Sequence, residues 1–269
     1  MSGRIRLLVS DVDGTIVQPD KRLAPSTFAA AARLRDAGVA LALVSARPPR
    51  GIRWIAEALG LATPMAGFNG GMLTEADGTL IENLPLADDV VRQALDLFAR
   101  AGVQPWLFSA FDWLVLDPAG HYVAHERYTI RFDERVVSGF GPYLGRADKV
   151  VGVSADFDYL ARVEADLQAL LGERASVHRS QRYYLDVTHP DANKGAAVRR
   201  LAALLGVPLS EVAAIGNMEN DVPMFAVAGL SIAMGNASPE VQAAAGHVTG
   251  ANGRDGWAQA VDRFVLGGT

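Results

Sequence analysis

Two carboxylates separated by a single residue, Asp11 and Asp13, directly follow the apolar run of residues 5–9. A run of this length is typical of a buried strand, and ligands of open α/β sheets bind just beyond the carboxyl ends of such strands. Gly14 then allows the chain to turn away sharply. Carboxylates this close repel each other unless a proton or a cation neutralises them, and Mg²⁺ prefers oxygen ligands. The stretch therefore predicts a catalytic, magnesium-binding pair.

Two other interpretations would also account for a strand followed by acidic residues. Asp-Gly is a common turn dipeptide, so a plain acidic turn after a strand would contain the same residues. An EF-hand loop counted from Asp11 needs glycine at its sixth position and glutamate at its twelfth. Here glycine is the fourth residue and Arg22 is the twelfth. The EF-hand is thereby excluded, and a plain turn remains as the alternative.

Three more polar stretches stand where a strand is predicted to end or a helix to begin. They are residues 45–47 (SAR), 193–195 (NKG) and 216–221 (GNMEND). Taken singly, each has an ordinary explanation: a helix cap at Ser45, a solvated charge at Lys194, a polar loop after residue 216. Lys194 nevertheless lies at the end of its helix where a positive charge opposes the macrodipole. Together, and in this order, the stretches point much more specifically to a single site.

The elements that must position these residues alternate between strand and helix at both ends of the chain. Residues 25–37 read as a helix between Pro25 and Gly38, and residues 39–44 as a buried strand. Such a unit implies parallel pairing with a right-handed crossover. We expect a doubly wound, Rossmann-like α/β core made of residues 1–84 and 188–269. Its other expected strands are 65–68, 72–74, 79–82, 212–215, 230–234 and 247–249, and its other helices are 51–59, 194–205, one opening at 238–239, and 257–265.

Residues 85–187 have a different pattern, with strands in adjacent pairs. The expected helices are 88–101 and 157–171, and the expected strands are 105–108, 113–116, 149–154, 175–178 and 183–187. Paired strands with two helices predict an inserted α+β domain on an antiparallel sheet. Some of its aromatic and basic side chains are candidates for lining a substrate pocket, namely Trp106, Trp113, His121, His125, Arg127, Tyr128, Arg131, Arg179, Tyr183 and Tyr184. We expect most of the aromatic ones to pack in or on that sheet instead.

Composition excludes several classes of function. The 269 residues include 25 basic and 30 acidic side chains, a net charge of −5, and no basic block, so nucleic acid is not an expected partner. The lack of cysteine excludes disulfides, thiolate metal sites and a cysteine nucleophile. Apolar stretches such as residues 37–44 are too short to span a bilayer, and the first residues lead into a strand without a signal peptide. We expect a soluble cytoplasmic protein.

In order and in residue type, the four stretches resemble the haloacid dehalogenase-like hydrolase superfamily over the whole chain. The module inserted between the second and third stretches resembles the large α/β cap of the Cof-type sugar-phosphate phosphatase branch. Residues 11–15 (DVDGT) are the most specific part of the match. The resemblance implies Mg²⁺-dependent hydrolysis of a small phosphorylated metabolite, such as a sugar phosphate, through an aspartyl-phosphate. It also implies that residues 85–187 form a cap that governs substrate specificity.

The resemblance further implies a role for each candidate residue. Asp11 would attack phosphorus, and Asp13 would protonate the leaving alcohol and later deprotonate water. An acid at the second position favours phosphatase or mutase chemistry over that of the superfamily's ATPases and dehalogenases. The remaining roles are phosphate binding by Ser45, Lys194 and Asn220, substrate binding by Arg47 and Asn69, and Mg²⁺ binding by Asp11, Asp13, Asn217 and Asp221. Fixed charges of this kind are most of what phosphoryl transfer needs from a protein.

One position departs from the family pattern. The family usually has Gly-Asp where this chain has Gly216-Asn217, and that aspartate is a metal ligand. An amide oxygen can coordinate Mg²⁺ but carries no formal charge, so metal affinity should fall. Two alternatives to the phosphatase hypothesis therefore stay open. One is a weakly active or inactive homologue that only binds a phosphorylated ligand, and the other is a phosphomutase or a disaccharide-phosphate phosphatase.

Overall fold

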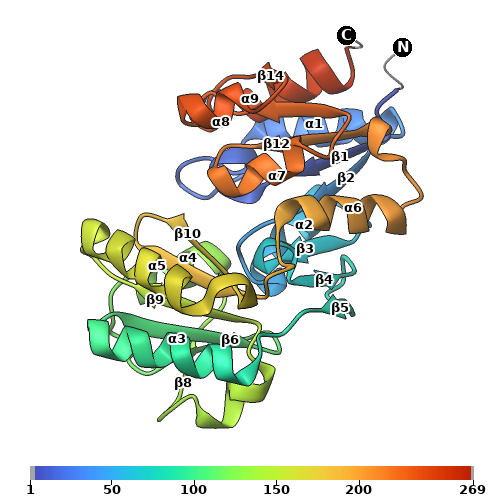
Figure 1. Ribbon diagram of the computed structural model, residues 1–269. Coiled ribbons are helices and arrows are strands. Elements are labelled where there is room, and N and C mark those ends of the chain that lie inside the picture. The colour runs from blue at the N-terminus through green and yellow to red at the C-terminus, as the bar shows by residue number, and fades with distance from the viewer. Residues whose placement is uncertain (1–3, 268–269) are drawn as a thin grey trace.

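The computed structural model describes residues 4–267, which form two regions, each built around its own sheet (Figure 1). One region contains a five-stranded sheet made from both ends of the chain, and the other contains a six-stranded sheet from its middle. A third sheet has three strands, which lie within residues 65–83 and follow the first two α-helices in the sequence. This arrangement confirms the predicted α/β fold with a parallel-sheet core and an inserted α+β module.

The five-stranded sheet is entirely parallel, in the order β14-β13-β12-β1-β2. Its strands are β1 (Leu7–Ser10), β2 (Ala40–Leu43), β12 (Val212–Gly216), β13 (Leu230–Ala233) and β14 (His247–Val248). The chain runs outward from β1 to β2 and later returns on the other side of β1 through β12. Strand order thus reverses between β1 and β12, which is where doubly wound sheets bind ligands. Asp11 follows β1 and Asn217 follows β12, so both lie at this crevice.

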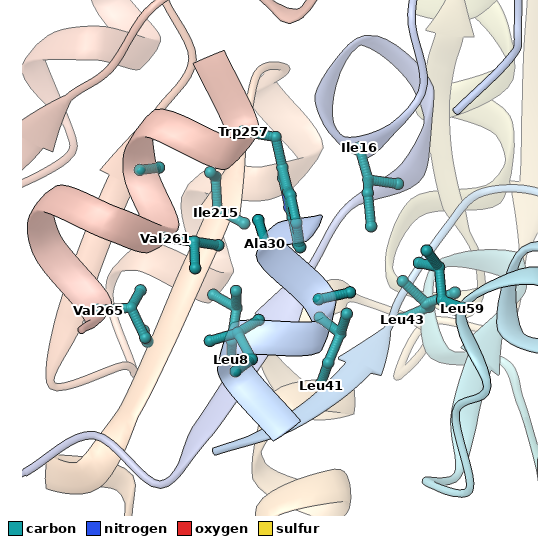
Figure 2. Close-up of a cluster of buried hydrophobic side chains, with 14 of the residues drawn as sticks. Leu8, Ile16, Ala30, Leu41, Leu43, Leu59, Ile215, Trp257, Val261 and Val265 are labelled. Carbon is teal, nitrogen blue, oxygen red and sulfur yellow. The ribbon is translucent and has the colours of Figure 1, made fainter. Parts of the chain in front are cut away.

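Helices cover both faces of the parallel sheet. They are α1 (Pro25–Asp36), α2 (Pro49–Leu59), α6 (Lys194–Leu204), α7 (Val222–Phe225), α8 (Pro239–Ala243) and α9 (Gly256–Ala260), the last continued by a wider helical turn at Val261–Val265. Leu8 and Ile215 pack with α1, α2 and α9 on one face (Figure 2). Leu7 and Val9 point to the opposite face and pack with α6, α7 and α8, as the alternation of side chains along a strand requires. No helix within residues 4–267 has the length and apolar character needed to cross a membrane.

The three-stranded sheet carries one of the candidate residues. Its strands, which pair antiparallel, are β3 (Met65–Gly67), β4 (Met72–Thr74) and β5 (Leu80–Asn83). A parallel bridge from Val44 to Ala66 joins β3 to the end of β2. Asn69 lies in the turn that follows β3, with a left-handed φ of 58°, and its backbone N–H donates to the Ser45 carbonyl at 2.8 Å. The sheet therefore brings Asn69 beside the loop that follows β2.

The six-stranded sheet has the order β10-β11-β9-β6-β7-β8 and is antiparallel except for the β7–β8 pair. Its strands are β6 (Gln104–Ser109), β7 (Asp112–Val115), β8 (Arg135–Val136), β9 (Lys149–Val153), β10 (Ser176–Gln181) and β11 (Tyr184–Thr188), and its helices are α3 (Asp88–Ala101), α4 (Val123–Ile130) and α5 (Phe157–Leu171). Helices α3 and α5 share one buried cluster with the sheet. Helix α4 packs on the other face, where Val123 and Ile130 meet Trp106, Trp113 and Tyr184.

Helix α4 corrects the prediction of two helices in the inserted module, because the described chain has three there. Left-handed residues bound it on both sides, Tyr122 at φ 61° and Arg131 at φ 59°, and neither flank carries a conventional capping side chain. The predicted domain boundaries fall just after β5 ends at Asn83 and one residue before β11 ends at Thr188. We keep residues 85–187 as the proposed extent of this module and call it the cap, and we call the remainder the core.

Candidate active site

Asp11 lies at the carboxyl end of β1 and is almost fully buried. Its backbone N–H donates to the Ile215 carbonyl at 3.0 Å, which holds it against β12. Its Oδ1 accepts from Lys194 Nζ at 2.7 Å, and its Oδ2 accepts from Thr15 Oγ1 at 2.8 Å. Burial and the nearby charge of Asp221 raise the pKa of Asp11 to about 7 against the lowering effect of Lys194. Asp11 is thus a fixed carboxylate whose two oxygens have defined directions.

The turn after Asp11 depends on Gly14. Its φ of 78° is left-handed, and a Cβ at this position would lie 2.4 Å from the Asn217 side chain. Any larger residue would therefore strain the backbone and also push away Asn217. The sharp turn expected from the sequence is confirmed, and it is what brings the β1 and β12 loops into contact.

Lys194 joins the β1 loop to the β12 loop. It is the first residue of α6 and only 2 % exposed, and its Nζ lies 2.7 Å from Asp11 Oδ1 and 2.6 Å from Asp221 Oδ1. Burial alone would lower the pKa of Lys194, but the two carboxylates outweigh it and hold the pKa above its ordinary range. The Asn193 side chain caps α6 by accepting from the Ala196 N–H at 2.8 Å. The ammonium is therefore a permanent positive charge beside Asp11.

Asp221 lies beneath the site, with both of its oxygens engaged by the protein. Oδ1 accepts from Lys194, and Oδ2 accepts from the backbone N–H groups of Asn217 at 2.7 Å and Met218 at 2.9 Å. A Cβ at Gly216 would come within 2.5 Å of the Asp221 side chain, so this close packing requires glycine. These contacts shape the β12 loop and hold Lys194 in place, and the role of Asp221 as a magnesium ligand stays a prediction.

Asn217 points its side-chain amide into a small group of oxygen atoms. The inward atom of the amide lies 3.2 Å from Asp11 Oδ2, 2.9 Å from the Asp13 carbonyl oxygen and 3.1 Å from Thr15 Oγ1. Hydrogen bonding favours the amide orientation in which this atom is the nitrogen and donates to those oxygens. In the opposite orientation the amide oxygen joins the Asp11 carboxylate and the Asp13 carbonyl.

These groups fit the ligand preference of Mg²⁺, because all three are oxygen donors: a carboxylate, a backbone carbonyl and an amide. Within residues 4–267, no cluster of three or more His, Cys, Asp or Glu side chains is arranged to hold a metal ion. A magnesium site here would rest on Asp11, the carbonyl of Asp13 and Asn217, with a single formal negative charge.

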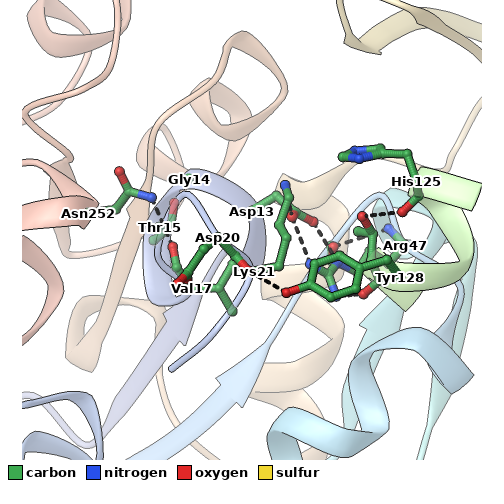
Figure 3. Close-up of polar contacts among 12 residues, drawn as sticks. Asp13, Gly14, Thr15, Val17, Asp20, Lys21, Arg47, His125, Tyr128 and Asn252 are labelled. Atoms are coloured by element: carbon green, nitrogen blue, oxygen red, sulfur yellow. Dashed lines mark hydrogen bonds and ion pairs between the residues drawn. The ribbon is translucent and has the colours of Figure 1, made fainter. Parts of the chain in front are cut away.

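The side chain of Asp13 is held by two cations (Figure 3). Arg47 binds it through two bonds, Nε to Oδ2 at 2.6 Å and Nη2 to Oδ1 at 2.8 Å, and Lys21 Nζ lies 2.7 Å from Oδ1. Burial would raise the pKa of Asp13, but Arg47 and then Lys21 outweigh it and hold the pKa well below its usual range. The two cations thus favour the ionised form of Asp13.

Ser45, Asn69 and Asn220 form a further polar part of the site. Ser45 Oγ accepts from the Arg47 backbone N–H at 3.1 Å, which shapes the loop after β2. Asn220 Nδ2 donates to Asn69 Oδ1 at 3.1 Å. The Oδ1 atom of Asn220 is buried and has no hydrogen-bond partner in the described part of the chain. This polar group is consistent with a ligand or water at the site.

The predicted residues converge on a cavity of about 50 Å³ between core and cap. Six of the nine line it, namely Asp11, Asp13, Ser45, Arg47, Lys194 and Asn220. An adjoining cavity of about 420 Å³ shares Lys194 and Asn220 with it and is also lined by Asn69. Asn217 and Asp221 support the floor through the bonds described above. The structure therefore brings all nine residues into one place.

Several cap side chains complete the small cavity. The pocket candidates His125, Tyr183 and Tyr184 line it, whereas Trp106 and Trp113 pack inside the cap. Sequence reasoning missed three charged lining residues, Lys21, Glu126 and Lys149. Only Lys21 had a local signal, its position eight residues after Asp13 in the same loop. Glu126 and Lys149 reach the cavity only through the packing of α4 and β9.

Together, the fold and this geometry define an α/β protein in which a buried carboxylate at the end of a strand lines a cavity. The protein belongs to the haloacid dehalogenase-like hydrolases, because the model of that family matches residues 8–261. This confirms the resemblance found in the four sequence stretches.

Individual relatives span nearly the whole chain. An HMP-PP phosphatase of Cronobacter sakazakii is 29% identical over 248 residues, which are 90% of this chain and 89% of the relative. The 5-amino-6-(5-phospho-D-ribitylamino)uracil phosphatase YitU of Bacillus subtilis is 26% identical over 271 residues, 96% of this chain and 97% of the relative. The crystal structure of a haloacid dehalogenase-like hydrolase from Bacteroides thetaiotaomicron matches with a TM-score of 0.87 at 26% identity, covering 97% of this chain and 99% of that one.

Proposed function

We propose that the protein is a cytoplasmic, Mg²⁺-dependent phosphatase that hydrolyses a small phosphorylated metabolite, such as a sugar phosphate, through an aspartyl-phosphate on Asp11. The observation that carries this proposal is the placement of Asp11. It is a buried carboxylate at the end of β1, fixed by Lys194 and Thr15, with Asp13 on the same cavity. A phosphoryl group needs a nucleophile, a nearby acid and fixed positive charge, and this cavity offers all three.

In the first step, an Asp11 oxygen would form a bond to phosphorus while the bond from phosphorus to the leaving oxygen breaks. Asp13, released from Arg47 and protonated, would give its proton to that oxygen. In the second step, Asp13 would take a proton from water as the water oxygen attacks phosphorus. The bond to Asp11 would then break and release inorganic phosphate, leaving Asp11 as it began.

The other residues would bind and orient the phosphoryl group. Lys194 would stabilise its oxygens with the charge that Asp11 and Asp221 hold in place, and Ser45 and Asn220 would donate hydrogen bonds to it. Bound Mg²⁺ would supply further positive charge to the same oxygens. In this geometry Arg47 is a positioning residue for Asp13, since its guanidinium also donates to the Thr129 carbonyl at 2.7 Å.

The two named relatives support a phosphatase over a mutase, because both carry the name of a phosphatase. The competing function is phosphate-ligand binding without turnover, and Asn217 is the observation that favours it. The same experiment separates the two functions.

The test is hydrolysis of p-nitrophenyl phosphate with Mg²⁺ and with EDTA, for the wild type and Asp11→Asn. We expect Mg²⁺-dependent release of nitrophenol by the wild type alone. Rapid acid quench with labelled phosphate ester should leave label on the wild-type protein and none on Asp11→Asn. A wild type that binds phosphate but releases no nitrophenol would favour the binding function.

A further inference from the structure

The cap side of the small cavity contains a carboxylate that the reaction above does not use. Glu126, in the first turn of α4, is 8% exposed and lines the same cavity as Asp11 and Asp13. Burying a carboxylate is costly unless it has a partner. The cap therefore presents a buried, polar acceptor directly opposite the reacting groups.

Charge pairing in the cavity sets Glu126 apart. Asp11 is paired with Lys194, and Asp13 with both Arg47 and Lys21. Within residues 4–267, Glu126 is the one carboxylate lining this cavity that has no ion pair within 4.0 Å. Its acceptor oxygens are therefore available to a ligand.

The cap lysine that lines this cavity, Lys149, already has two partners. Lys149 Nζ lies 2.6 Å from Asp186 Oδ2 and donates to the Ala46 carbonyl at 3.1 Å. Because Asp186 neutralises it, Lys149 adds little net charge to attract an anionic group. Burial raises the pKa of Glu126 to about 7, although Lys149 and Arg47 oppose the shift. This side of the cavity is thus suited to accepting hydrogen bonds and poorly suited to a second anion.

Tyr184 adds a second polar group to this part of the cavity. It is 7% exposed and lines the cavity, and its hydroxyl makes no hydrogen bond of standard geometry within the described residues. The hydroxyl lies beside the Glu126 carboxyl, and burial and then that carboxyl raise the pKa of Tyr184. Its ring is fixed edge-on against Trp106, with centroids 5.2 Å apart. Buried polar groups without partners are rare in native proteins and call for a ligand or water. Glu126 and Tyr184 together make such a position in the cap.

We propose that Glu126, assisted by Tyr184, is a specificity-determining residue that binds a hydroxyl or amine on the leaving group, close to the ester oxygen. This inference rests on the proposed phosphatase function. The cavity that Glu126 lines is small, about 50 Å³, and it adjoins one of about 420 Å³ that would hold the rest of the substrate. The substrate class is therefore an ester whose alcohol carries a neutral or cationic hydrogen-bond donor near the phosphate, and alcohols with a second anionic group there are disfavoured.

The experiment compares two matched pairs of phosphate esters. Glycerol 3-phosphate and propyl phosphate differ in their hydroxyls, and O-phosphoethanolamine and ethyl phosphate differ in an amine. We expect the wild type to prefer the donor-bearing member of a pair about tenfold in kcat/KM, since hydrogen bonds to a charged group are the stronger ones. Glu126→Gln should reduce that preference to about threefold or less, mainly through KM, because the contact exists before and during the reaction.

Glu173→Gln is the matched control. Glu173 is an exposed residue on the cap, and the same charge removal there should leave the preference unchanged. Tyr184→Phe should reduce the preference less than Glu126→Gln does. If Glu126→Gln fails to fold by circular dichroism, Tyr184→Phe decides the question in its place.

The outcomes separate the two proposals. A wild type that does not hydrolyse p-nitrophenyl phosphate with Mg²⁺ overturns the proposed function. A wild type that hydrolyses it but treats both members of each pair alike overturns the role of Glu126. So does a donor preference that Glu126→Gln leaves intact.

Discussion

The two halves of the cavity are built in different ways. On the core side, Asp11, Ser45 and Lys194 come from the end of a strand, the end of the next strand and the start of a helix, and the backbone fixes where each begins. On the cap side, Glu126 and Tyr184 point inward from a helix and from the face of a strand. The order of strands and helices therefore fixes where the core side chains lie. Packing of the cap decides which further side chains line the cavity.

The strongest test of this contrast is Asp11→Asn, which removes the proposed nucleophile from the core side. The amide cannot form an acyl phosphate, so turnover should fall by about 10⁴-fold or more. Steady-state phosphate release measures it, and circular dichroism checks that the fold is kept. Turnover equal to the wild type would show that the reaction does not centre on β1.

Asp13→Ala should have the next largest effect, and its size should depend on the leaving group. A poor leaving alcohol needs a proton, whereas nitrophenolate does not, so an alkyl phosphate should lose about 10²-fold more than p-nitrophenyl phosphate. The measurement is kcat/KM for both esters. Equal losses would mean that Asp13 is not the general acid, and that the bonds from Arg47 and Lys21 hold it for another purpose.

Asn217→Asp tests the proposed magnesium site on the core side of the cavity. The added carboxylate should lower the Mg²⁺ concentration for half-maximal activity roughly tenfold, or about 1.4 kcal/mol. Without metal, the new charge would lie beside Asp11 and the Asp13 carbonyl, so the Tm in EDTA should fall and then rise more on adding Mg²⁺ than in the wild type.

The control for this prediction adds the same charge elsewhere. Gln93→Glu lies on α3 of the cap, where Arg174 already donates to Gln93. It should leave the Mg²⁺ titration unchanged. Coincident titrations of the wild type and Asn217→Asp would remove Asn217 from the metal site.

The smallest expected effect belongs to the cap side and is a pH dependence. The pKa of Glu126 is raised from 4.5 to about 7 in the folded protein. Between these values the native state keeps a proton that the unfolded state has released, so the free energy of unfolding falls as pH rises through this window. Glu126→Gln has no carboxyl group to titrate, so its free energy of unfolding should not show this fall with pH. Its Tm relative to the wild type should therefore rise by a few degrees from pH 5 to pH 8, and a constant difference would show that Glu126 ionises normally.

Much of the fold could be predicted because its signals are local. Helices α3 and α5 begin and end at the predicted residues, 88–101 and 157–171, since their apolar faces and flanking glycines are visible in the sequence. Helix α4 was missed because it is short and polar, and left-handed residues rather than capping side chains bound it. Its constraints are tertiary: Val123 and Ile130 pack into the cap, and Ile130 also lies close to Gly51 on α2.

The part of the site that depends on local sequence signals could also be predicted. Residues near a strand end, such as Asp11 and Asn217, can be recognised from their residue type and spacing. The pairing of Asp13 with Arg47 could not be read from the sequence, because the two are 34 residues apart and meet only in the folded chain. Glu126 sits in a stretch, HERYT, that is indistinguishable from a solvated surface helix.

The loop after β2 also connects the cap to the phosphate site. Its Ala46 carbonyl accepts from Lys149, and its Arg47 donates to the Thr129 carbonyl, so two hydrogen bonds from neighbouring residues tie it to the cap. At about 1 kcal/mol each, they would favour the docked cap by roughly thirtyfold. Because coupling between two equilibria is reciprocal, a ligand that favours one position of this loop would also shift the equilibrium between a docked and an open cap. Affinity for the product phosphate at Ser45 would therefore be linked to the fraction of molecules with an open cap.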